Sequence, residues 1–167
     1  CSASIRLLAA PSKPEKAELI QGHEMAQLLA MMQRSFSYVI VDTEPGFTEA
    51  VLAACDAADT VYIVAAFNSR AGIVHVRSAL ATFQSLGYSA NKLKVVISRV
   101  SRDIDQLDNM EVQLSYPVTA LLPSDFRLVT DAINKGVPLL ASHPDSTLAR
   151  GIMDVVRDSI GADVLIP

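Results

Sequence analysis

The segment DTEPG, from Asp42 to Gly46, has the residue types and spacing best suited to ligand chemistry in this chain. It follows YVIV, a run that is apolar on both faces and typical of a buried parallel strand. Ligands of open parallel sheets bind beyond the carboxyl ends of strands. An aspartate there can hold magnesium through water, and a glycine turn lets backbone amides approach a phosphate. The residues alone favour a simpler role for Asp42, as a cap of the turn or of the following helix.

A second polar turn, Pro123 to Asp125, follows the apolar run that ends at Leu122. Asp125 precedes a segment of helical period, so an N-cap role is predicted. It also stands where a ligand of a parallel sheet would bind, and this second interpretation stays open beside the first.

Other reactive residue types are too scattered to form a predicted site. The histidines have no Ser or Cys partner pattern, and the cysteines have no zinc spacing. We therefore expect no histidine-based catalysis and read the cysteines as structural residues. Glu44 is expected to be an exposed turn residue and not a catalytic base. The residues concerned are His23, His75, His143, Cys1 and Cys55.

The elements that must position these turns alternate between short apolar runs and longer segments of helical period. This pattern predicts an α/β fold, with a doubly wound, mostly parallel sheet covered by helices on both faces. The expected strands are Ile5 to Ala9, Tyr38 to Val41, Thr60 to Ala65, Leu93 to Ile97 and Val118 to Leu122. The expected helices are Gly22 to Arg34, Thr48 to Ala58, Gly72 to Leu86, Asp105 to Leu114, Asp125 to Asn134 and Ser146 to Ile160.

Length and composition predict a single domain, residues 1–167, with one sizeable core. The formal net charge of -4 is spread along the chain, which argues against nucleic-acid binding. No stretch approaches the roughly 20 apolar residues of a membrane span, and the start does not resemble a signal peptide. We expect a cytoplasmic protein without direct membrane insertion. The opening at Cys1, without a methionine, suggests a piece of a longer protein.

Residues 36–66, FSYVIVDTEPGFTEAVLAACDAADTVYIVAA, resemble the Walker B and switch II region of the MinD/ParA ATPase superfamily. IRLLAAPSKPEKAELI, residues 5–20, resembles a passage typical of the CpaE/TadZ pilus-assembly family. LKVVISRV and LLPSDFRLVTDAINKGVPLL resemble the superfamily's following strand and its base-binding passage. The series covers nearly the whole chain in order.

The resemblance implies a P-loop NTPase-like fold that binds ATP and Mg2+. It implies that Asp42 is the magnesium-associated acid, that Thr43, Pro45 and Gly46 form the switch, and that Ser98, Pro123 and Asp125 lie near the nucleotide base. It also implies a homodimer, with pilus-assembly or secretion proteins as partners, recruited to the cell pole or the inner-membrane pilus machinery. Arg70 falls in a region that helps form the family's dimer face, although an ordinary surface arginine is the favoured interpretation.

The sequence departs from that family at the phosphate site. Neither G-x-x-x-x-G-K-[ST] nor the deviant K-G-G-x-G-K-[ST] is present, so the first strand and its phosphate loop are lacking. Glu44 replaces a proline of the usual turn, and Ser98 replaces an asparagine of the base pocket. These departures predict that ATP and Mg2+ bind weakly or not at all to this segment, which alone should not hydrolyse ATP.

Three functions follow as hypotheses: a nucleotide-switched CpaE/TadZ-like localisation factor, a scaffold that has lost nucleotide chemistry, and a receiver-like signalling domain. The third ranks last because IRLLAAP offers no acidic pair and LLPSD offers no lysine. If the strand bearing the loop is absent, Tyr38 to Val41 must pair with Thr60 to Ala65 or leave an apolar edge open to self-association.

Overall fold

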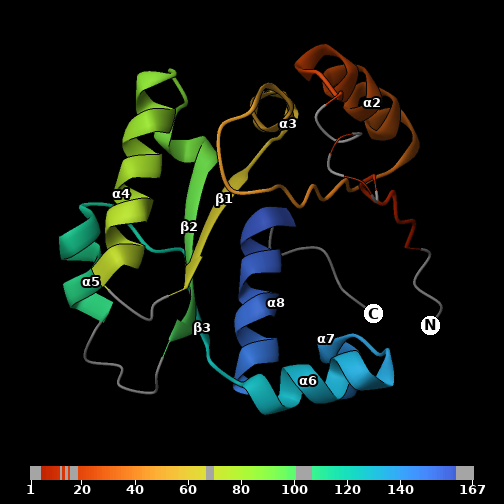
Figure 1. The fold of residues 1–167 in the computed structure, drawn as a ribbon. Helices are drawn as coiled ribbons and strands as arrows, with labels where there is room; N and C mark the ends of the chain where they lie inside the picture. The colour runs from red at the N-terminus through yellow and green to blue at the C-terminus, as the bar shows by residue number, and fades with distance from the viewer. Residues whose placement is uncertain are drawn as a thin grey trace. The chain divides into compact units, whose positions relative to one another are not determined.

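The computed structural model describes residues 5–11, 13, 15, 19–66, 70–100 and 107–160 (Figure 1). The chain groups into two compact units, residues 1–59 and residues 60–167, and each is treated by itself below. The expectation of a single domain over residues 1–167 stays a prediction.

The described part of the first unit contains the helices α2 (Gly22–Ser35) and α3 (Glu49–Ala57). They pack closely: Gly22 has no side chain, and a Cβ added there would lie only 3.0 Å from the Glu49 carbonyl oxygen. The Gln33 side-chain amide donates a hydrogen bond to the Ala57 carbonyl at 3.0 Å. The buried residues are few and small apart from one leucine: Leu29, Val51, Ala54 and Cys55. Cys55 is thus a buried core residue, as predicted.

The two strands predicted for this unit are not formed, and this prediction was wrong. Residues 5–9 and 38–41 have no strand assignment. All of their side chains except Val39 are exposed: Leu7 is 88% and Ile40 is 94% accessible. The physical reason is that a strand is completed by a neighbour that satisfies its backbone groups. Tyr38 to Val41 do not pair with residues 60–65. An apolar run by itself is therefore not sufficient to form a strand.

The described part of the second unit contains a three-stranded parallel sheet in the order β1-β2-β3. The strands are β1 (Val61–Ala66), β2 (Leu93–Val100) and β3 (Ala120–Pro123), which confirms the other three predicted strands. Ile63 lies opposite Val95, and Ile97 lies opposite Leu121. The central strand β2 supplies the core, since Leu93, Val95 and Val96 are all nearly inaccessible.

Helices cover both faces of this sheet, which confirms the doubly wound α/β fold (Figure 1). The helices α4 (Arg70–Ser85) and α5 (Leu107–Leu114) lie on one face. The helix α8 (Thr147–Ile160) lies on the other, where it packs on β3. The chain between β3 and α8 forms α6 (Phe126–Lys135) and α7 (Leu139–Ser142), and the 3-10 turn η1 (Ala90–Lys92) leads into β2.

Local capping chemistry explains most of the helix ends. The side chains of Thr48, Asp125 and Ser146 accept hydrogen bonds from backbone amides three residues later, at 3.4, 3.1 and 3.1 Å. All three were predicted N-caps. Gly136 ends α6 with φ 63°, a conformation that favours glycine. The turn α7 and the 3-10 turn were not predicted, and the predicted start at Asp105 lies outside the described residues.

Candidate nucleotide-binding site

The turn from Asp42 to Gly46 is exposed along its whole length in the first unit. Gly46 has φ 139°, which explains why glycine stands there, and a Cβ at that position would meet nothing within 4 Å. Thr48 Oγ1 donates to the Glu44 carboxylate at 3.5 Å. Glu44 is therefore an exposed turn residue that supports the entry into α3, as predicted. The backbone in front of Gly46 is open to an approaching ligand.

The turn offers magnesium a single carboxylate ligand, Asp42, and not a complete set of ligands. Among the residues that the structure describes, no group of three or more His, Cys, Asp or Glu side chains could hold a metal ion. Magnesium is commonly bound through one or two carboxylates, with waters and substrate phosphates completing its octahedron. Asp42 therefore fits as a single ligand, direct or through water, of a magnesium ion that a nucleotide brings with it. The turn alone is not a metal centre.

In the second unit, three predicted site residues come together at the carboxyl ends of β2 and β3. Ser98 on β2 lies opposite Leu122, and Val100 lies opposite Pro123. The Ser124 amide donates to the Val100 carbonyl at 3.0 Å, which fixes the turn that leads to Asp125. Asp125 accepts from the Leu128 amide, so its N-cap role is established by geometry. Its second carboxylate oxygen remains for a ligand role, which stays a prediction.

Arg99 is a residue at this edge that the sequence interpretation missed. It has φ 59°, in the left-handed region, and lies at the register shift between Ser98 and Val100. A non-glycine residue in this conformation stores roughly 1–2 kcal/mol of strain, and such positions concentrate at functional sites. The side chain is exposed. The available signal was the polar pair Ser98 and Arg99 after the apolar run VVI of the same strand.

The predicted site thus falls on two separate units. Asp42, Thr43, Pro45 and Gly46 belong to residues 1–59, and Ser98, Pro123 and Asp125 belong to residues 60–167. Arg70 begins α4, but its side chain lies outside the described part of the chain.

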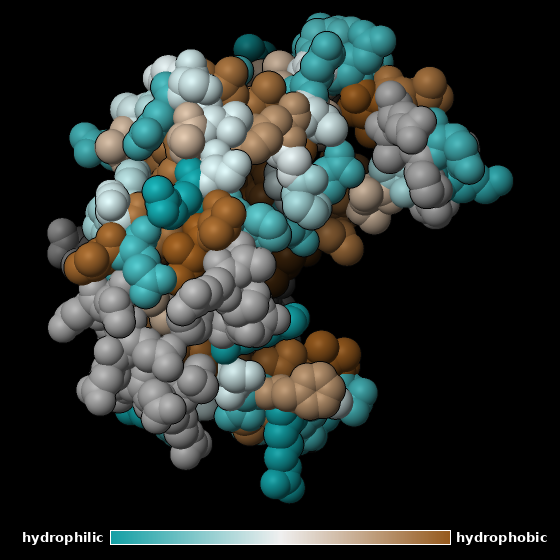
Figure 2. Space-filling view, turned by 60° about the vertical axis from the view of Figure 1, so that its left-hand side comes forward, coloured by the Kyte–Doolittle hydropathy of each residue, from teal (hydrophilic) through white to brown (hydrophobic). Residues whose placement is uncertain are grey.

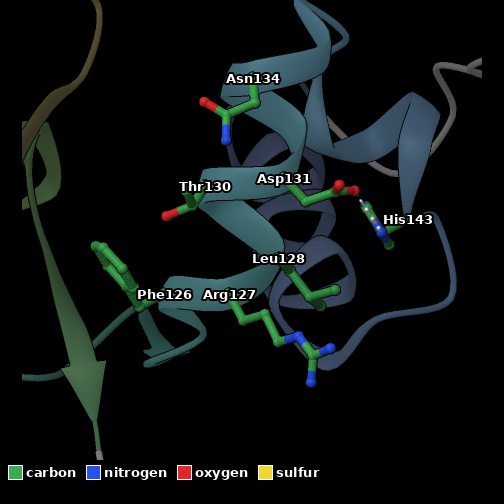
Figure 3. A pocket seen from close by; sticks show the side chains of 7 residues that line it. All are labelled: Phe126, Arg127, Leu128, Thr130, Asp131, Asn134 and His143. Carbon is green, nitrogen blue, oxygen red and sulfur yellow. Dashed lines mark ion pairs between the residues drawn. The ribbon is translucent and has the colours of Figure 1, made fainter.

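A shallow hollow of about 530 Å³ runs along α6, and the residues that line it are drawn in Figure 3. Asp131 accepts from Lys135 Nζ at 2.7 Å and lies 3.4 Å from His143 Nε2. The hydrogen bond from Lys135 lowers the pKa of Asp131, and the nearby positive charges of Lys135, His143 and Arg127 lower it further. The group ties α6 to the residue that follows α7.

The sequence did not predict the partners of His143. Its Nε2 lies near Asp131, and Ser142 Oγ lies 3.0 Å from its Nδ1, the other ring nitrogen. Ser142 Oγ also lies within hydrogen-bond distance of the Pro138 and Leu139 carbonyls in its own helix, at 3.2 and 3.4 Å. These two acceptors compete with His143 for its single proton. An activated serine instead gives its proton to the histidine.

None of the helices in the described residues is both long enough and apolar enough to span a membrane.

Comparison with known proteins first gives the class of fold: this chain has the α/β fold of the MinD/ParA P-loop ATPases. It superposes on a ParA family ATPase from Chlorobium tepidum with a TM-score of 0.76 and 19% identity, over 86% of this chain and 59% of that one. It superposes on the MinD cell division protein of Aquifex aeolicus with a TM-score of 0.70 and 19% identity, over 87% and 63%. It superposes on the septum site-determining protein MinD of Pyrococcus horikoshii, complexed with Mg-ADP, with a TM-score of 0.71 and 11% identity. That match covers 89% of this chain and 60% of the other.

In sequence, the chain is 28% identical over 155 residues to an uncharacterized ATP-binding protein of Methanocaldococcus jannaschii. That match covers 90% of this chain and 53% of the relative, so the chain spans about half of the relative's length. No protein-family model matches the chain.

Proposed function

We propose that this chain is the switch- and base-binding portion of a MinD/ParA-like ATPase, and that its parent protein localises Flp/Tad pilus machinery as CpaE/TadZ proteins do. The observation that carries the proposal is the exposed DTEPG turn, with the positive φ of Gly46, on a chain of this fold. A turn of this kind presents its backbone to a phosphate and keeps Asp42 available for the associated magnesium.

Two further features support nucleotide binding. The M. jannaschii relative is named as an ATP-binding protein, and the P. horikoshii structure was determined with Mg-ADP. The carboxyl edge formed by Ser98, Pro123 and Asp125 lies where parallel sheets bind ligands. ATP with Mg2+ is therefore the proposed cofactor of the parent protein. In this proposal, the phosphate loop belongs to a part of the parent protein outside these 167 residues, which contain no such motif.

The proposed mode of action is a switch and not the processing of a metabolite. The DTEPG turn is exposed, and such segments change order when a nucleotide binds or is hydrolysed. In the proposal, ATP brings two copies of the parent protein together, and the change of the turn alters their contacts with pilus-assembly proteins. The passage at residues 5–20 supports the CpaE/TadZ assignment through its resemblance to that family.

The test is binding of a fluorescent ATP analogue to the protein extended to its native N-terminus and to the 167-residue chain. Each is measured with and without magnesium. We expect magnesium-dependent binding in the extended protein only, weakened at least about tenfold by Asp42→Ala, since that change removes a magnesium ligand. Asp59→Ala, an exposed carboxylate on the same unit, is the matched control and should bind as the wild type. Equal binding of both variants and the wild type would contradict the role of Asp42.

A scaffold without nucleotide chemistry is the second candidate. It is favoured by Glu44, which adds a negative charge at the exposed turn, and by Ser98 in place of the family's asparagine. Under this alternative, neither the extended protein nor the chain binds the analogue. A tagged parent protein would still take up its cellular position if it were a scaffold. Under either candidate, deletion of the pilus genes should disturb that position.

A further inference from the structure

His143 is fixed at the point where α7 ends and the chain turns toward α8. Its backbone amide donates to the Leu139 carbonyl at 2.8 Å, and its own carbonyl accepts from the Ser146 amide at 3.2 Å. The Ser146 hydroxyl donates to the same carbonyl at 2.9 Å and accepts from the Ala149 amide at 3.1 Å, within α8. The backbone of His143 is therefore held from both sides, which leaves its half-buried ring in a defined position.

One nitrogen of this ring faces a carboxylate on α6. His143 Nε2 lies 3.4 Å from Asp131 Oδ2, and Figure 3 shows this ion pair as the dashed line between the two side chains. Lys135 Nζ donates to the same oxygen at 2.7 Å. That hydrogen bond holds the pKa of Asp131 below 3.8, so the carboxylate is charged wherever an imidazole titrates. Nε2 thus meets a negative charge in both neutral and mildly acidic solution.

The other ring nitrogen faces a hydroxyl that has competing acceptors. Ser142 Oγ lies 3.0 Å from His143 Nδ1, and 3.2 and 3.4 Å from the carbonyls of Pro138 and Leu139. A hydroxyl has one proton but two lone pairs. If Nδ1 carries a proton, it can donate to a lone pair of Ser142 Oγ, and the serine proton can go to a carbonyl. If Nδ1 carries none, it must compete with both carbonyls for the serine proton.

The charged ring is the form that suits both contacts at once. An imidazolium has an N–H on each nitrogen, so Nε2 can donate to Asp131 while Nδ1 donates to Ser142. In one neutral tautomer Nδ1 has to compete for the serine proton, and in the other the bare Nε2 points at a carboxylate. Uptake of a proton by His143 removes both mismatches.

Other charged groups occur on the elements around this contact. Lys135 and Arg127 lie on α6, and their positive charges also act on Asp131. Asp145 in the turn and Arg150 on α8 are exposed, and within the described residues neither forms an ion pair with the histidine. The two cations of α6 disfavour a proton on the ring, and Asp131, in direct contact with it, favours one.

We propose that His143 is a proton-dependent link: when its ring gains a proton, it pairs with Asp131 and holds α6 against the turn between α7 and α8. An imidazole takes up its proton at about pH 6.5. The folded chain offers the charged ring a carboxylate that the unfolded chain lacks. The stabilisation is therefore present below that pH and is lost as pH rises through it.

Solvent protons can reach this link. The side chains of His143 and Asp131 keep 26% and 39% of their accessible surface. Figure 2 shows hydrophilic residues at the surface at the height of α6, beside hydrophobic ones. Because α6 begins at the Asp125 cap, the link acts on the helix that leaves the carboxyl edge of the sheet. It needs no nucleotide, so the inference does not depend on the proposed function.

The first test follows proton uptake by the histidine rings of the 167-residue chain in an NMR titration. Asp131→Asn should weaken the proton affinity of His143 about two- to fivefold, because it removes the charge that the imidazolium faces. Lys135→Gln should strengthen it, because a competing cation is removed. Asp154→Asn, which removes an exposed carboxylate on α8, is the matched control and should have no effect. His75, exposed on α4, should be unchanged in every variant.

The second test is a double-mutant cycle of His143→Gln and Asp131→Asn, measured by urea unfolding at about pH 5.5 and about pH 8. The coupling between the two side chains should change the unfolding equilibrium constant about two- to fivefold at the lower pH and clearly less at the higher. An unchanged proton affinity of His143 in Asp131→Asn would overturn the proposal. So would an equal coupling at both pH values, because the two side chains would then share a contact that does not depend on the proton.

Discussion

Gly72 on α4 lies so close to Ala66 on β1 that a Cβ at position 72 would be 2.7 Å from the Ala66 carbonyl oxygen. Replacing a helix-interior glycine with alanine normally stabilises a helix by about 0.5–1 kcal/mol. Here the contact is with backbone, so β1 and α4 must separate. We expect Gly72→Ala to lower the free energy of unfolding by about 1–3 kcal/mol, measured by urea denaturation.

Gly151→Ala on α8 is the control for that change. Its added Cβ would lie 3.0 Å from Leu122 Cδ2, the end of a flexible side chain, and 3.4 Å from the Leu121 carbonyl oxygen. A small shift of Leu122 should relieve the contact, so the loss should be smaller than for Gly72→Ala. Equal losses would show that the close approach of α4 to β1 is not the cause.

The Tyr62 hydroxyl connects β1 to α8 and should contribute measurably to stability. It donates to Asp158 at 3.1 Å and lies 2.7 Å from Ser159 Oγ. Tyr62→Phe removes these bonds, and we expect a loss of about 1 kcal/mol in the free energy of unfolding. Tyr38→Phe is the control, because Tyr38 is 61% accessible and should tolerate the change.

The same tyrosine gives this stability a pH dependence. Burial is the main cause that raises its pKa above 10.0, and the Asp158 carboxylate raises it further. A raised folded-state pKa gives a contribution that is present below 10.0 and lost as pH rises through the folded value. The difference between wild type and Tyr62→Phe should therefore shrink in alkaline solution, as followed by urea midpoints. A difference that grows there would contradict the assignment.

Two substitutions of Asp125 distinguish its structural role, as a helix cap, from a role in binding a ligand. Its carboxylate caps α6 through the Leu128 amide, so Asp125→Ala should cost about 1 kcal/mol of stability. Asp125→Asn keeps a capping oxygen and should change stability by only a few tenths of a kcal/mol. If Asp125 also contacts the nucleotide, Asp125→Asn will weaken ATP-analogue binding by the extended protein without altering Tm. Unchanged binding would leave the N-cap as its only role.

The sequence predicted well those elements whose signals are local. The caps Thr48, Asp125 and Ser146 and the apolar runs of β1, β2 and β3 follow from residue type and spacing, and the structure confirms them. Residues 5–9 and 38–41 carry the same apolar signal but form no strand. Pairing depends on a neighbour, and periodicity within one segment does not reveal whether the neighbour is there.

The candidate site was predictable in its residue types but not in its detail. The DTEPG turn and the glycine at position 46 could be predicted from the sequence, because a turn with a φ such as the 139° of Gly46 strongly favours glycine. The left-handed Arg99 was not, since a β-bulge depends on the register between strands. The partners of His143 were also missed, because Asp131 comes from a different helix and the turn α7 has no periodic signal.

The pair of Asp131 and Lys135 gives the last prediction, a stability change that is present at neutral pH and lost in strong acid. The hydrogen bond from Lys135 holds the pKa of Asp131 below 3.8. A depressed folded-state pKa gives stability that is present above 3.8 and lost as pH falls through the folded value. Asp131→Asn should therefore lower the urea midpoint slightly at neutral pH and have no effect in strong acid. Lys135→Gln should produce most of the same loss, and the double variant little more, because both changes remove one interaction. Additive losses would mean that His143 or Arg127, and not Lys135, is the main partner of this carboxylate.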